Sequence, residues 1–249
     1  MEKQRFIDKI ALVTGGANGL GRGMTEQLVR EGAQVIVFDI EDDTMEEVYA
    51  DNERVYCMHC DVRDYGQVQE SVAKVIEEFG HIDVLMNNAG ITHRQLFLEC
   101  SQEGWLDVMD TNLNGAFYVA QAVARTMVDK GVKGYIVNTS SNSARKTIGG
   151  ITPYGPSKAA VSMLTQVMAL ELAQYDIHVN AVAPGTSKTR ITEGTRFDPE
   201  RNAAFLAKMP FGRYGEIEEM VSVALFLASD DASFITGETI YEEGGFSLL

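Results

Sequence analysis

Tyr154 and Lys158 are the two residues whose types and spacing point most directly to chemistry. They lie four positions apart at the start of a predicted helix, so both side chains should share one helix face. A free tyrosine is a poor proton donor or acceptor at neutral pH because its pKa is about 10. A nearby ammonium group favours the phenolate and lowers that pKa. The pair therefore predicts proton exchange with a reactant, although this spacing is also common on helix surfaces by chance.

A glycine-rich turn follows the first apolar run of the chain. The run Ile10–Val13 leads into residues 14–21, TGGANGLG, where a helical pattern begins. Glycines allow a tight turn from strand to helix and a close approach of the backbone to a pyrophosphate. The helix N-terminus adds free N–H groups and the positive end of a dipole. The turn therefore predicts a dinucleotide site, in a chain whose net charge of −15 would otherwise repel such a ligand.

Asp39 ends the second apolar run, 18 residues after Gly21. An acidic side chain here can accept hydrogen bonds from the ribose hydroxyls of NAD and would repel the additional phosphate of NADP. The alternative is an ordinary loop acid, since three more acidic residues follow it. No arginine or lysine lies between Glu31 and Asp51 to bind a phosphate. NAD is therefore the expected cofactor.

Seven short apolar runs alternate with longer amphipathic stretches and must position these residues. Several runs are almost continuously apolar, as expected for parallel strands covered on both faces. Their alternation with helices predicts one α/β domain over residues 1–249, a doubly wound (Rossmann) parallel sheet of about seven strands with helices on both faces. The expected strands are Ile10–Val13, Val35–Phe38, Val55–Met58, Val84–Met86, Tyr135–Thr139, His178–Val182 and Thr239–Tyr241, and the expected helices lie near 20–31, 43–50, 65–79, 101–129, 154–174 and 216–228, with a short one after Asp198.

The composition excludes several other classes of protein. Acidic residues outnumber basic ones by 36 to 21, so the chain lacks the basic surface that binds nucleic acid or anionic lipid. No stretch approaches the ~18 apolar residues of a transmembrane helix, and three cysteines fit a reducing compartment. Cys57 and Cys60 flank His59, but residues three apart on a strand point to opposite faces. We therefore expect a cytoplasmic protein with no metal, membrane or nucleic-acid partner.

Several motifs in order resemble the short-chain dehydrogenase/reductase family, from about residue 8 to the C-terminus. The resemblance implies a nicotinamide-dependent oxidoreductase and a homo-oligomer, most often a tetramer, whose subunits meet through the helices near 101–129 and 154–174. The motifs are Thr14-Gly15-x-x-x-Gly19-x-Gly21, Asp61-Val62, Asn87-Asn88-Ala89-Gly90, Asn112, Ser141, Tyr154-x-x-x-Lys158, Pro184-Gly185 with Thr189, Ile235-Thr236-Gly237 and Gly244-Gly245.

The resemblance implies a catalytic role for four residues. Tyr154 would exchange a proton with the substrate oxygen, and Lys158 would lower the tyrosine pKa and hold the nicotinamide ribose. Ser141 would hydrogen-bond the reacting oxygen, and Asn112 would hold a water molecule of the proton relay. Ser140 competes with Ser141, but the family's spacing from serine to tyrosine selects Ser141.

The resemblance also implies which residues line the cofactor site. Asp61 and Val62 would contact adenine, and the segment after Pro184 would orient the nicotinamide. Hydride passes directly between cofactor and substrate, so the chemistry needs no metal. The expected cofactor-binding residues are Gly15, Asn18, Gly19, Leu20, Gly21, Asp39, Ile40, Asp61, Val62, Asn88, Ala89, Gly90, Tyr154, Lys158, Pro184, Gly185, Thr186 and Thr189.

Basic residues gather where a substrate is expected. Three stretches without acidic residues, 84–98, 130–170 and 177–192, follow the carboxyl ends of expected strands. A positive rim would serve any dinucleotide, but it also fits an anionic or sugar-like substrate. Family members acting on sugar acids resemble this chain in having an arginine at the place of Arg94. The expected substrate-binding residues are Arg94, Ser141, Ser143, Arg145 and Tyr154.

Residues 186–212 are expected to form a polar lid, which favours a small polar substrate over a steroid or long acyl chain. The sequence thus predicts an NAD-dependent dehydrogenase acting on a secondary hydroxyl of a polyol, sugar or sugar acid. Alternatives with the same chemistry are a 3-oxoacyl-thioester reductase and a hydroxysteroid dehydrogenase. A non-catalytic NAD-binding protein is disfavoured because all four catalytic positions are intact.

Overall fold

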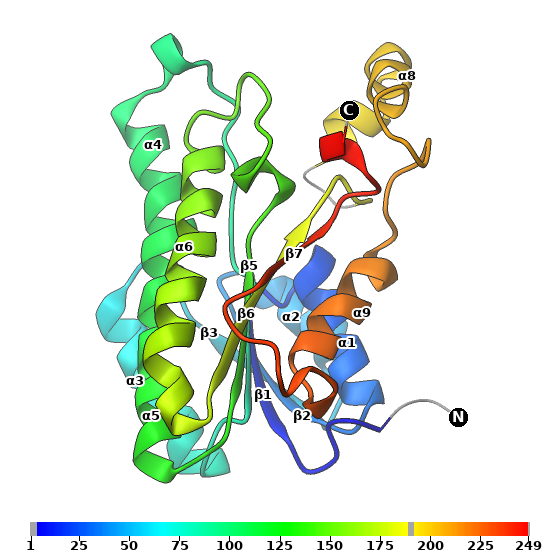
Figure 1. Ribbon diagram of the computed structural model, residues 1–249. Helices are drawn as coiled ribbons and strands as arrows, with labels where there is room; N and C mark the ends of the chain where they lie inside the picture. The colour runs from blue at the N-terminus through cyan, green and yellow to red at the C-terminus, as the bar shows by residue number, and fades with distance from the viewer. Residues whose placement is uncertain (1–3, 189–191, 249) are drawn as a thin grey trace.

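The computed structural model of the protein describes residues 4–188 and 192–248 (Figure 1). Its strands form one parallel sheet in the order β3-β2-β1-β4-β5-β6-β7. The chain winds outward in both directions from β1 and β4, and open sheets of this kind bind ligands where the winding reverses. The strands are β1 (Ile10–Thr14), β2 (Gln34–Asp39), β3 (Val55–His59), β4 (Val84–Asn87), β5 (Tyr135–Thr139), β6 (His178–Pro184) and β7 (Thr239–Glu242).

Helices cover both faces of the sheet (Figure 1). One face carries α1 (Gly19–Arg30), α2 (Asp42–Tyr49) and α9 (Ile217–Leu227), and the other carries α3 (Tyr65–Phe79), α5 (Ala116–Lys130) and α6 (Tyr154–Leu172). Side chains along β2 alternate between the two cores: Val35 and Val37 pack beneath α1 and α2, whereas Ile36 and Phe38 pack beneath α3 and α5. Because both faces of each strand are buried, the runs are continuously apolar. The predicted doubly wound sheet is confirmed.

Local sequence signals fix several helix ends. The Asp198 carboxylate accepts hydrogen bonds from the backbone N–H groups of Glu200 and Arg201, so Asp-Pro-Glu opens a helix as the sequence predicts. Glu216 and Glu219 form a capping box at the start of α9. The remaining helical segments are α7 (Glu193–Arg196), α8 (Pro199–Leu206), η1 (Phe97–Glu99), η3 (Asn142–Ala144), η4 (Ala173–Tyr175), η6 (Asp230–Ala232) and η7 (Phe246–Leu248).

The long helix expected near 101–129 is interrupted. α4 (Gln102–Met109) passes into a π-helical turn, η2 (Asp110–Gly115), before α5 begins. A π-turn spaces its hydrogen bonds five residues apart and so inserts one extra residue. The two flanking segments continue one amphipathic stretch, which is why the sequence predicts a single helix. The turn carries Asn112, and such turns are frequent at functional sites.

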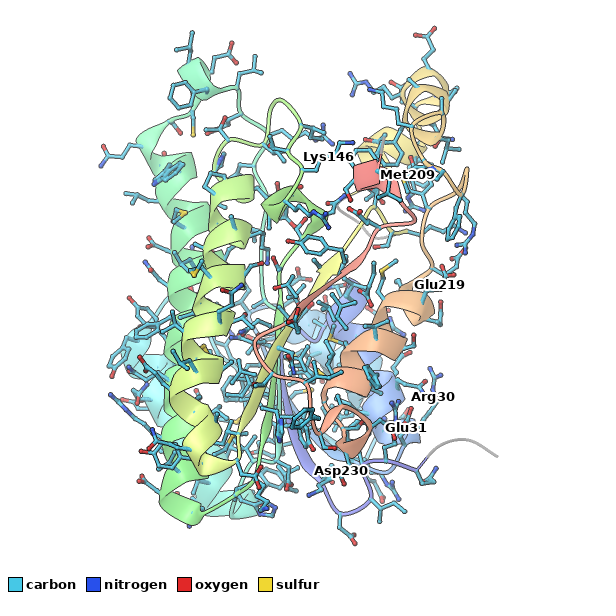
Figure 2. The ribbon with its side chains drawn as sticks, viewed as in Figure 1. Arg30, Glu31, Lys146, Met209, Glu219 and Asp230 are labelled. Carbon is cyan, nitrogen blue, oxygen red and sulfur yellow. The ribbon has the colours of Figure 1, made fainter. Side chains whose placement is uncertain are left out.

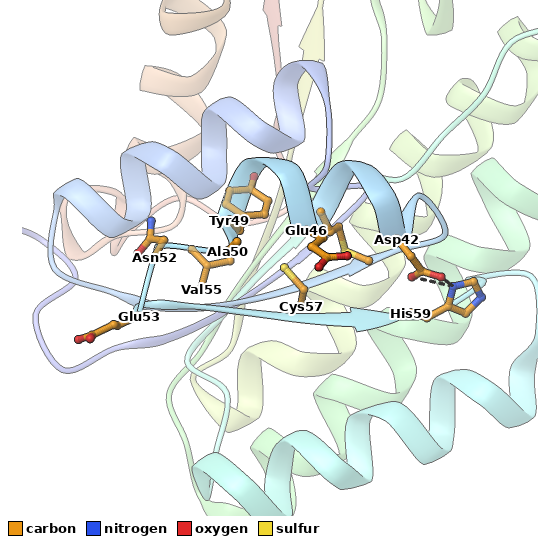
Figure 3. Close-up of a pocket in the computed structure, with 10 residues that line it drawn as sticks. Asp42, Glu46, Tyr49, Ala50, Asn52, Glu53, Val55, Cys57 and His59 are labelled. Atoms are coloured by element: carbon orange, nitrogen blue, oxygen red, sulfur yellow. Dashed lines mark hydrogen bonds and ion pairs between the residues drawn. The ribbon is translucent and has the colours of Figure 1, made fainter.

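Cys57 and Cys60 point to opposite faces of the sheet, as strand alternation predicts. Cys57 packs with the core beneath α1 and α2, and Cys60 belongs to the opposite core. Cys57 and His59 also line a groove of about 490 Å³ between α2 and the edge strand β3 (Figure 3), which none of the predicted site residues lines. Across the described residues, no helix is long and apolar enough to cross a membrane.

Candidate active site

The glycine turn after β1 is too tight for larger residues at two positions. A Cβ atom on Gly21 would lie 2.0 Å from the carbonyl oxygen of Gly15, and one on Gly15 would lie 2.9 Å from Cα of Ala89. Gly15 and Gly19 also have positive φ angles of 65° and 55°, which favour glycine. α1 begins at Gly19, and Leu20 packs on the core behind it. The backbone therefore forms a cradle at a helix N-terminus, which fits a pyrophosphate.

The loop after β4 is fixed to this turn. The Thr14 hydroxyl accepts hydrogen bonds from the backbone N–H groups of Asn88 and Ala89 at 2.9 and 3.0 Å. The Asn88 side chain donates to the carbonyl oxygens of Thr14 and Gly15 at 3.1 and 3.2 Å. Asn88 and Ala89 therefore lie beside the predicted pyrophosphate cradle, as the sequence predicts for cofactor-lining residues.

Asp39 lies across the same turn. One carboxylate oxygen accepts from the Ala17 N–H at 2.9 Å, and the other accepts from Ile40 and Glu41 at 2.8 and 3.1 Å. The Ile40 side chain is exposed beside it. Tyr49 on α2 adds a support that the sequence did not suggest: its hydroxyl donates to the Gly16 carbonyl oxygen at 2.6 Å. No short motif marks Tyr49, because this contact depends on how α2 packs.

Asp61 and Val62 follow β3, but their side chains have different surroundings. The Asp61 carboxylate accepts from the Arg63 guanidinium, and this hydrogen bond lowers the pKa of Asp61. Arg63 also bonds Asp107 at 3.0 Å. Val62 is buried against Gly115 of the π-turn, where a Cβ would come within 2.7 Å of it. Contact of Asp61 and Val62 with adenine remains a prediction.

Tyr154 and Lys158 lie in the first turns of α6, as predicted. Lys158 is 3% exposed, and its Nζ donates to the Thr139 carbonyl oxygen at 2.7 Å. The same Nζ lies 5.9 Å from the centre of the Tyr154 ring. Burial lowers the pKa of Lys158 to about 8. Lys158 is therefore held by the end of β5, with its ammonium group close to the tyrosine.

Ser141, not Ser140, is associated with Tyr154. Although Tyr154 is partly exposed, burial raises the pKa of its phenol, and a hydrogen bond with Ser141 offsets part of that shift. Ser141 accepts from the Ser143 backbone N–H at 3.1 Å, so the Ser143 backbone orients the Ser141 hydroxyl. The Ser140 hydroxyl donates instead to the Lys158 carbonyl oxygen at 2.9 Å and is buried.

The direction of the Tyr154 pKa shift differs from the expectation. Lys158 was expected to lower the pKa of the tyrosine, yet in the protein alone burial raises it. The physical reason is that the phenol oxygen and the ammonium group are both surrounded by protein, which disfavours the charged form of each. The ammonium also directs a hydrogen bond to the Thr139 carbonyl group.

Asn112 ties the loop after β4 to α6. Its side-chain oxygen accepts from the Ile91 N–H at 2.8 Å, and its amide donates to the Ile91 carbonyl oxygen and the Ser157 hydroxyl, each at 3.0 Å. A Cβ on Gly90 would lie 3.1 Å from Asn112 and 3.2 Å from Lys158 Nζ. Three of the four hydrogen bonds that the asparagine side chain can make are therefore used in positioning, and its predicted role in holding water stays a prediction.

The segment after β6 is fixed at its base. The Gly185 N–H donates to the Glu242 carbonyl oxygen at 2.9 Å, and the backbones of Thr186 and Lys188 each bond Gly215 at 3.1 Å. Pro184 is buried at the end of β6. Thr189, another predicted cofactor residue, lies outside the described residues. Thr186 and Lys188 are therefore held beside Gly215, although about 30 residues of sequence separate them.

The loops carrying Arg94 and Arg145 lie side by side. The Gln95 N–H donates to the Gly150 carbonyl oxygen at 3.1 Å, which joins the loop after β4 to the loop before α6. Arg94 is exposed. Arg145 is also exposed, and its guanidinium stacks over the Tyr241 ring at 5.4 Å. Stacking orients a guanidinium and leaves its edge available for hydrogen bonds.

Phe205, within the predicted lid, belongs to an aromatic cluster that the polar sequence of this segment does not indicate. Phe205 stacks on Tyr214 and on Phe246 of the C-terminal turn, with ring centres 5.3 and 6.1 Å apart. Lys146 donates to the Phe246 carbonyl oxygen at 3.0 Å. Figure 2 shows Lys146 and Met209 at this end of the molecule. Because the aromatic partners are distant in sequence, this cluster was not predicted, and the lid's polarity does not discriminate between substrates.

Glu242, the last residue of β7, was not predicted to be unusual. Both of its carboxylate oxygens are shielded from solvent and have no hydrogen-bond partner within residues 4–188 and 192–248. Burial raises the pKa of Glu242 to about 8. The folded protein therefore keeps a proton on this group at pH values where the unfolded chain has lost it.

Replacing Glu242 with glutamine should stabilise the protein more at high pH than at low pH. Glu242 takes up a proton on folding at any pH between its unfolded and folded pKa values. In that range the free energy of unfolding falls by about 1.4 kcal/mol for each unit by which the pH rises. The gain from Glu242→Gln should thus be about 3 kcal/mol larger near pH 8 than near pH 5, as measured by urea unfolding. The exposed neighbour Glu238→Gln serves as the control. An equal effect at both pH values would contradict the prediction.

Comparisons with known proteins agree with this geometry. A family model described as Enoyl-(Acyl carrier protein) reductase matches residues 15–247. A 3-oxoacyl-[acyl-carrier-protein] reductase of Thermotoga maritima is 40% identical over 98% of this chain and 100% of its own length. A 2-dehydro-3-deoxy-D-gluconate 5-dehydrogenase of Dickeya dadantii is 36% identical over 96% and 95%. A crystal structure of a gluconate 5-dehydrogenase from Burkholderia cenocepacia, in complex with NADP and tartrate, superposes with a TM-score of 0.94 at 31% identity, covering 100% of this chain and 98% of that one.

Proposed function

The chain belongs to the short-chain dehydrogenase/reductase family, and from that premise we propose that it is an NAD-dependent enzyme that interconverts a secondary alcohol and a ketone on a small polar substrate. The substrate class is a polyol, sugar or sugar acid. The observation that carries the proposal is that Tyr154, Lys158 and Ser141 lie together at the carboxyl ends of the strands, where the glycine turn also lies.

The chain's own residues handle the proton. When bound, the nicotinamide supplies or accepts the hydride. In the oxidation direction Tyr154 takes the proton from the substrate hydroxyl, and in the reduction direction it returns that proton to the carbonyl oxygen. Ser141 hydrogen-bonds the same oxygen and holds it beside the tyrosine. Lys158 opposes the cost of the buried phenolate through its charge, and Asn112 keeps the loop at Ile91 in place.

The cofactor site has the features that NAD requires. The glycine turn and the N-terminus of α1 fit the pyrophosphate, and Asp39 stands where a ribose hydroxyl would be bound. The carboxylate and the absence of basic residues from 32 to 50 favour NAD over NADP. The similar gluconate 5-dehydrogenase is bound to NADP, so the preference of this chain has to be measured directly. With three unpaired cysteines, we place the enzyme in the cytoplasm.

The substrate class rests on the two adjacent arginine loops. Arg94 and Arg145 can each form paired hydrogen bonds with a carboxylate or with sugar hydroxyls. Relatives named for gluconate and deoxygluconate, and a neighbour holding the hydroxy diacid tartrate, agree with that chemistry. The substrate lid is proposed at residues 186–212, and the described residues Thr186 and Lys188 at its start bond Gly215 just after its end.

Arg94→Ala and Arg145→Ala should each raise KM for a sugar-acid substrate by about tenfold, with kcat changed far less. The loss would be one charge-assisted contact that is made equally in the ground state and the transition state. Arg54→Ala, at an exposed position before β3, is the matched control. Unchanged KM values for both variants would show that the substrate is bound by other groups.

A 3-oxoacyl-thioester reductase is the second candidate function. The family description and the 40% identical relative favour it. Asp39 argues against it because such biosynthetic reductases use NADPH. A polar lid would disfavour an acyl chain or a steroid. Because Phe205, Tyr214 and Phe246 form an aromatic cluster there, the lid does not disfavour them.

Helices α5 and α6 expose several large apolar side chains, which supports a homo-oligomer, with a tetramer as the proposed state. Leu170 is 82% exposed and Met163 59% exposed on α6, and Phe117 on α5 is also open to solvent. Large exposed apolar side chains on two helices that pack together are typical of a surface covered by another subunit. The molar mass in solution, measured by light scattering, tests this assignment.

The direct test is formation of NADH by the purified protein across a panel of alcohols. The panel contains polyols, aldonic and uronic acids, hydroxysteroids and 3-hydroxyacyl thioesters, each with NAD and with NADP. Turnover of sugar-like compounds with NAD is the expected result. Turnover confined to thioesters with NADP would replace the proposal by the second candidate.

A further inference from the structure

Asp107 on α4 holds two separate loops with its two carboxylate oxygens. Its Oδ1 accepts a hydrogen bond from the Arg63 guanidinium at 3.0 Å, and its Oδ2 accepts one from the His93 ring at 2.7 Å. Arg63 belongs to the turn after β3, and His93 belongs to the loop after β4. One side chain on α4 therefore joins two loops that leave the carboxyl edge of the sheet from different strands.

The Arg63 end of this bridge reaches the predicted adenine site. The Arg63 guanidinium forms paired hydrogen bonds with the Asp61 carboxylate, from Nη2 to Oδ2 at 2.7 Å and from Nε to Oδ1 at 3.0 Å. Paired bonds of this kind fix the orientation of both groups. Because Asp61 is predicted to contact adenine, a ligand that holds Asp61 in place also holds the guanidinium and, through it, Asp107.

The His93 end of the bridge reaches the predicted substrate site. The loop after β4 is fixed at Ile91 by a hydrogen bond to the π-turn η2, and at Gln95 by a hydrogen bond to the loop before α6. His93 lies midway between these two points and directly precedes Arg94. Its bond to Asp107 therefore fixes the middle of the loop, the part that carries Arg94.

The bridge consists of charged groups at the surface, and this makes its order sensitive to a ligand. The side chains of Asp61, Arg63, Asp107 and His93 are all partly exposed to solvent. Exposed ion pairs are individually worth little, because ordering the side chains costs entropy and water competes for the same bonds. A ligand that immobilises one end of the bridge lowers the entropy cost of forming the remaining bonds, which couples the two ends.

We propose that Asp107 is a positioning residue that couples adenine binding at Asp61 to the order of the loop that carries Arg94. The inference rests on the proposed dinucleotide site, with adenine at Asp61, and applies to NAD and NADP alike because both contain adenine. The coupling is reciprocal, so an ordered substrate loop should in turn favour cofactor binding. Asp107 acts through Arg63 and His93 and takes no part in the proton chemistry.

Hydrogen exchange of the backbone amides, measured by mass spectrometry on the full chain, tests the coupling without a substrate. The probe is AMP, which carries the adenine and lacks the nicotinamide. Peptides covering residues 61–65 report the adenine site, and peptides covering residues 91–98 report the loop. AMP should slow exchange over 61–65, and should slow exchange over 91–98 by about threefold in the wild type.

The variants separate coupling from direct contact. Asp107→Ala removes both bonds of the bridge and should abolish the effect of AMP on 91–98 while the effect on 61–65 remains. Asp107→Asn keeps one acceptor oxygen for one partner, and serves if the alanine variant does not fold. Glu103→Gln removes an exposed charge one turn earlier on α4 and should behave as the wild type. His93→Gln keeps an N–H donor for Asp107, so it should retain the protection that His93→Leu loses.

Protection of 91–98 that persists in both Asp107 variants would overturn the inference, because AMP would then act on the loop by another route. Protection of 61–65 without any effect on 91–98 in the wild type would overturn it as well, and would leave the adenine site in place. If AMP binds and 61–65 stay unprotected, the assignment of adenine to Asp61 is wrong, and the inference is lost together with it.

Discussion

Replacing Tyr154 with phenylalanine should lower kcat/KM for the alcohol substrate by about a thousandfold or more. We propose that the phenol hydroxyl takes and returns the substrate proton, and phenylalanine keeps the ring that lies near Lys158. The Kd for NAD should change less than about twofold, because the glycine turn and Asp39 are untouched. The rate of NADH formation gives kcat/KM, and a separate binding titration gives the Kd for NAD.

Tyr175→Phe is the matched control for this variant. Tyr175 is an exposed tyrosine in the turn after the C-terminal end of α6, so its substitution removes a tyrosine hydroxyl far from the site. Thermal unfolding of both variants checks that the fold is intact. A Tyr154→Phe enzyme with ordinary kcat would show that another group transfers the proton.

The local parts of this site could be predicted from the sequence because each depends on neighbouring residues. The glycine turn is one such part: the Cβ that Gly21 lacks would collide with Gly15, only six positions away. The Tyr154–Lys158 pair is another, since helical spacing alone puts both on one face. The sheet followed from the continuously apolar strands, whose two faces are both buried.

Other features of the site depend on contacts between segments that are distant in sequence. The spacing of residues along the chain does not reveal those contacts. The π-turn at Asn112 is fitted to the packing of Val62 against Gly115, which the amphipathic pattern does not reveal. Glu242 looks like one more acid in a chain rich in acids, and only the structure shows that its oxygens are buried. The stacking of Phe205 on Phe246 likewise joins residues 41 positions apart in the sequence.

Ser140 and Ser141 show the same limit on a smaller scale. Strand alternation says that consecutive hydroxyls point in opposite directions, but not which of them faces the tyrosine. In the structure Ser140 bonds the backbone of α6 and the Ser162 hydroxyl at 2.7 Å, which commits it to holding the helix. Ser141 is left beside Tyr154. Ser140 therefore positions α6, and through it the Tyr154 and Lys158 side chains.

The placement of α6 also determines the pKa values of Lys158 and Tyr154. Burial raises the pKa of Tyr154 and lowers the pKa of Lys158 to about 8, so burial disfavours the charged form of each group. Together they are less costly, because an ammonium beside a phenolate compensates for the lost hydration of both. The ammonium is present below about pH 8 and is lost as the pH rises through that value.

Lys158→Met should therefore change the pH dependence of catalysis as well as its rate. Without the positive charge the phenolate is harder to form, so the rise of kcat/KM with pH should move upward by about one unit or more, and the rate near pH 7 should fall by about a hundredfold. Profiles of kcat/KM for oxidation, measured beside the exposed control Lys130→Met, test this. Loss of the bond to Thr139 could by itself loosen α6, and that effect would lower the rate equally at every pH. A reduced profile with an unshifted midpoint would thus assign Lys158 a structural role and remove it from the proton chemistry.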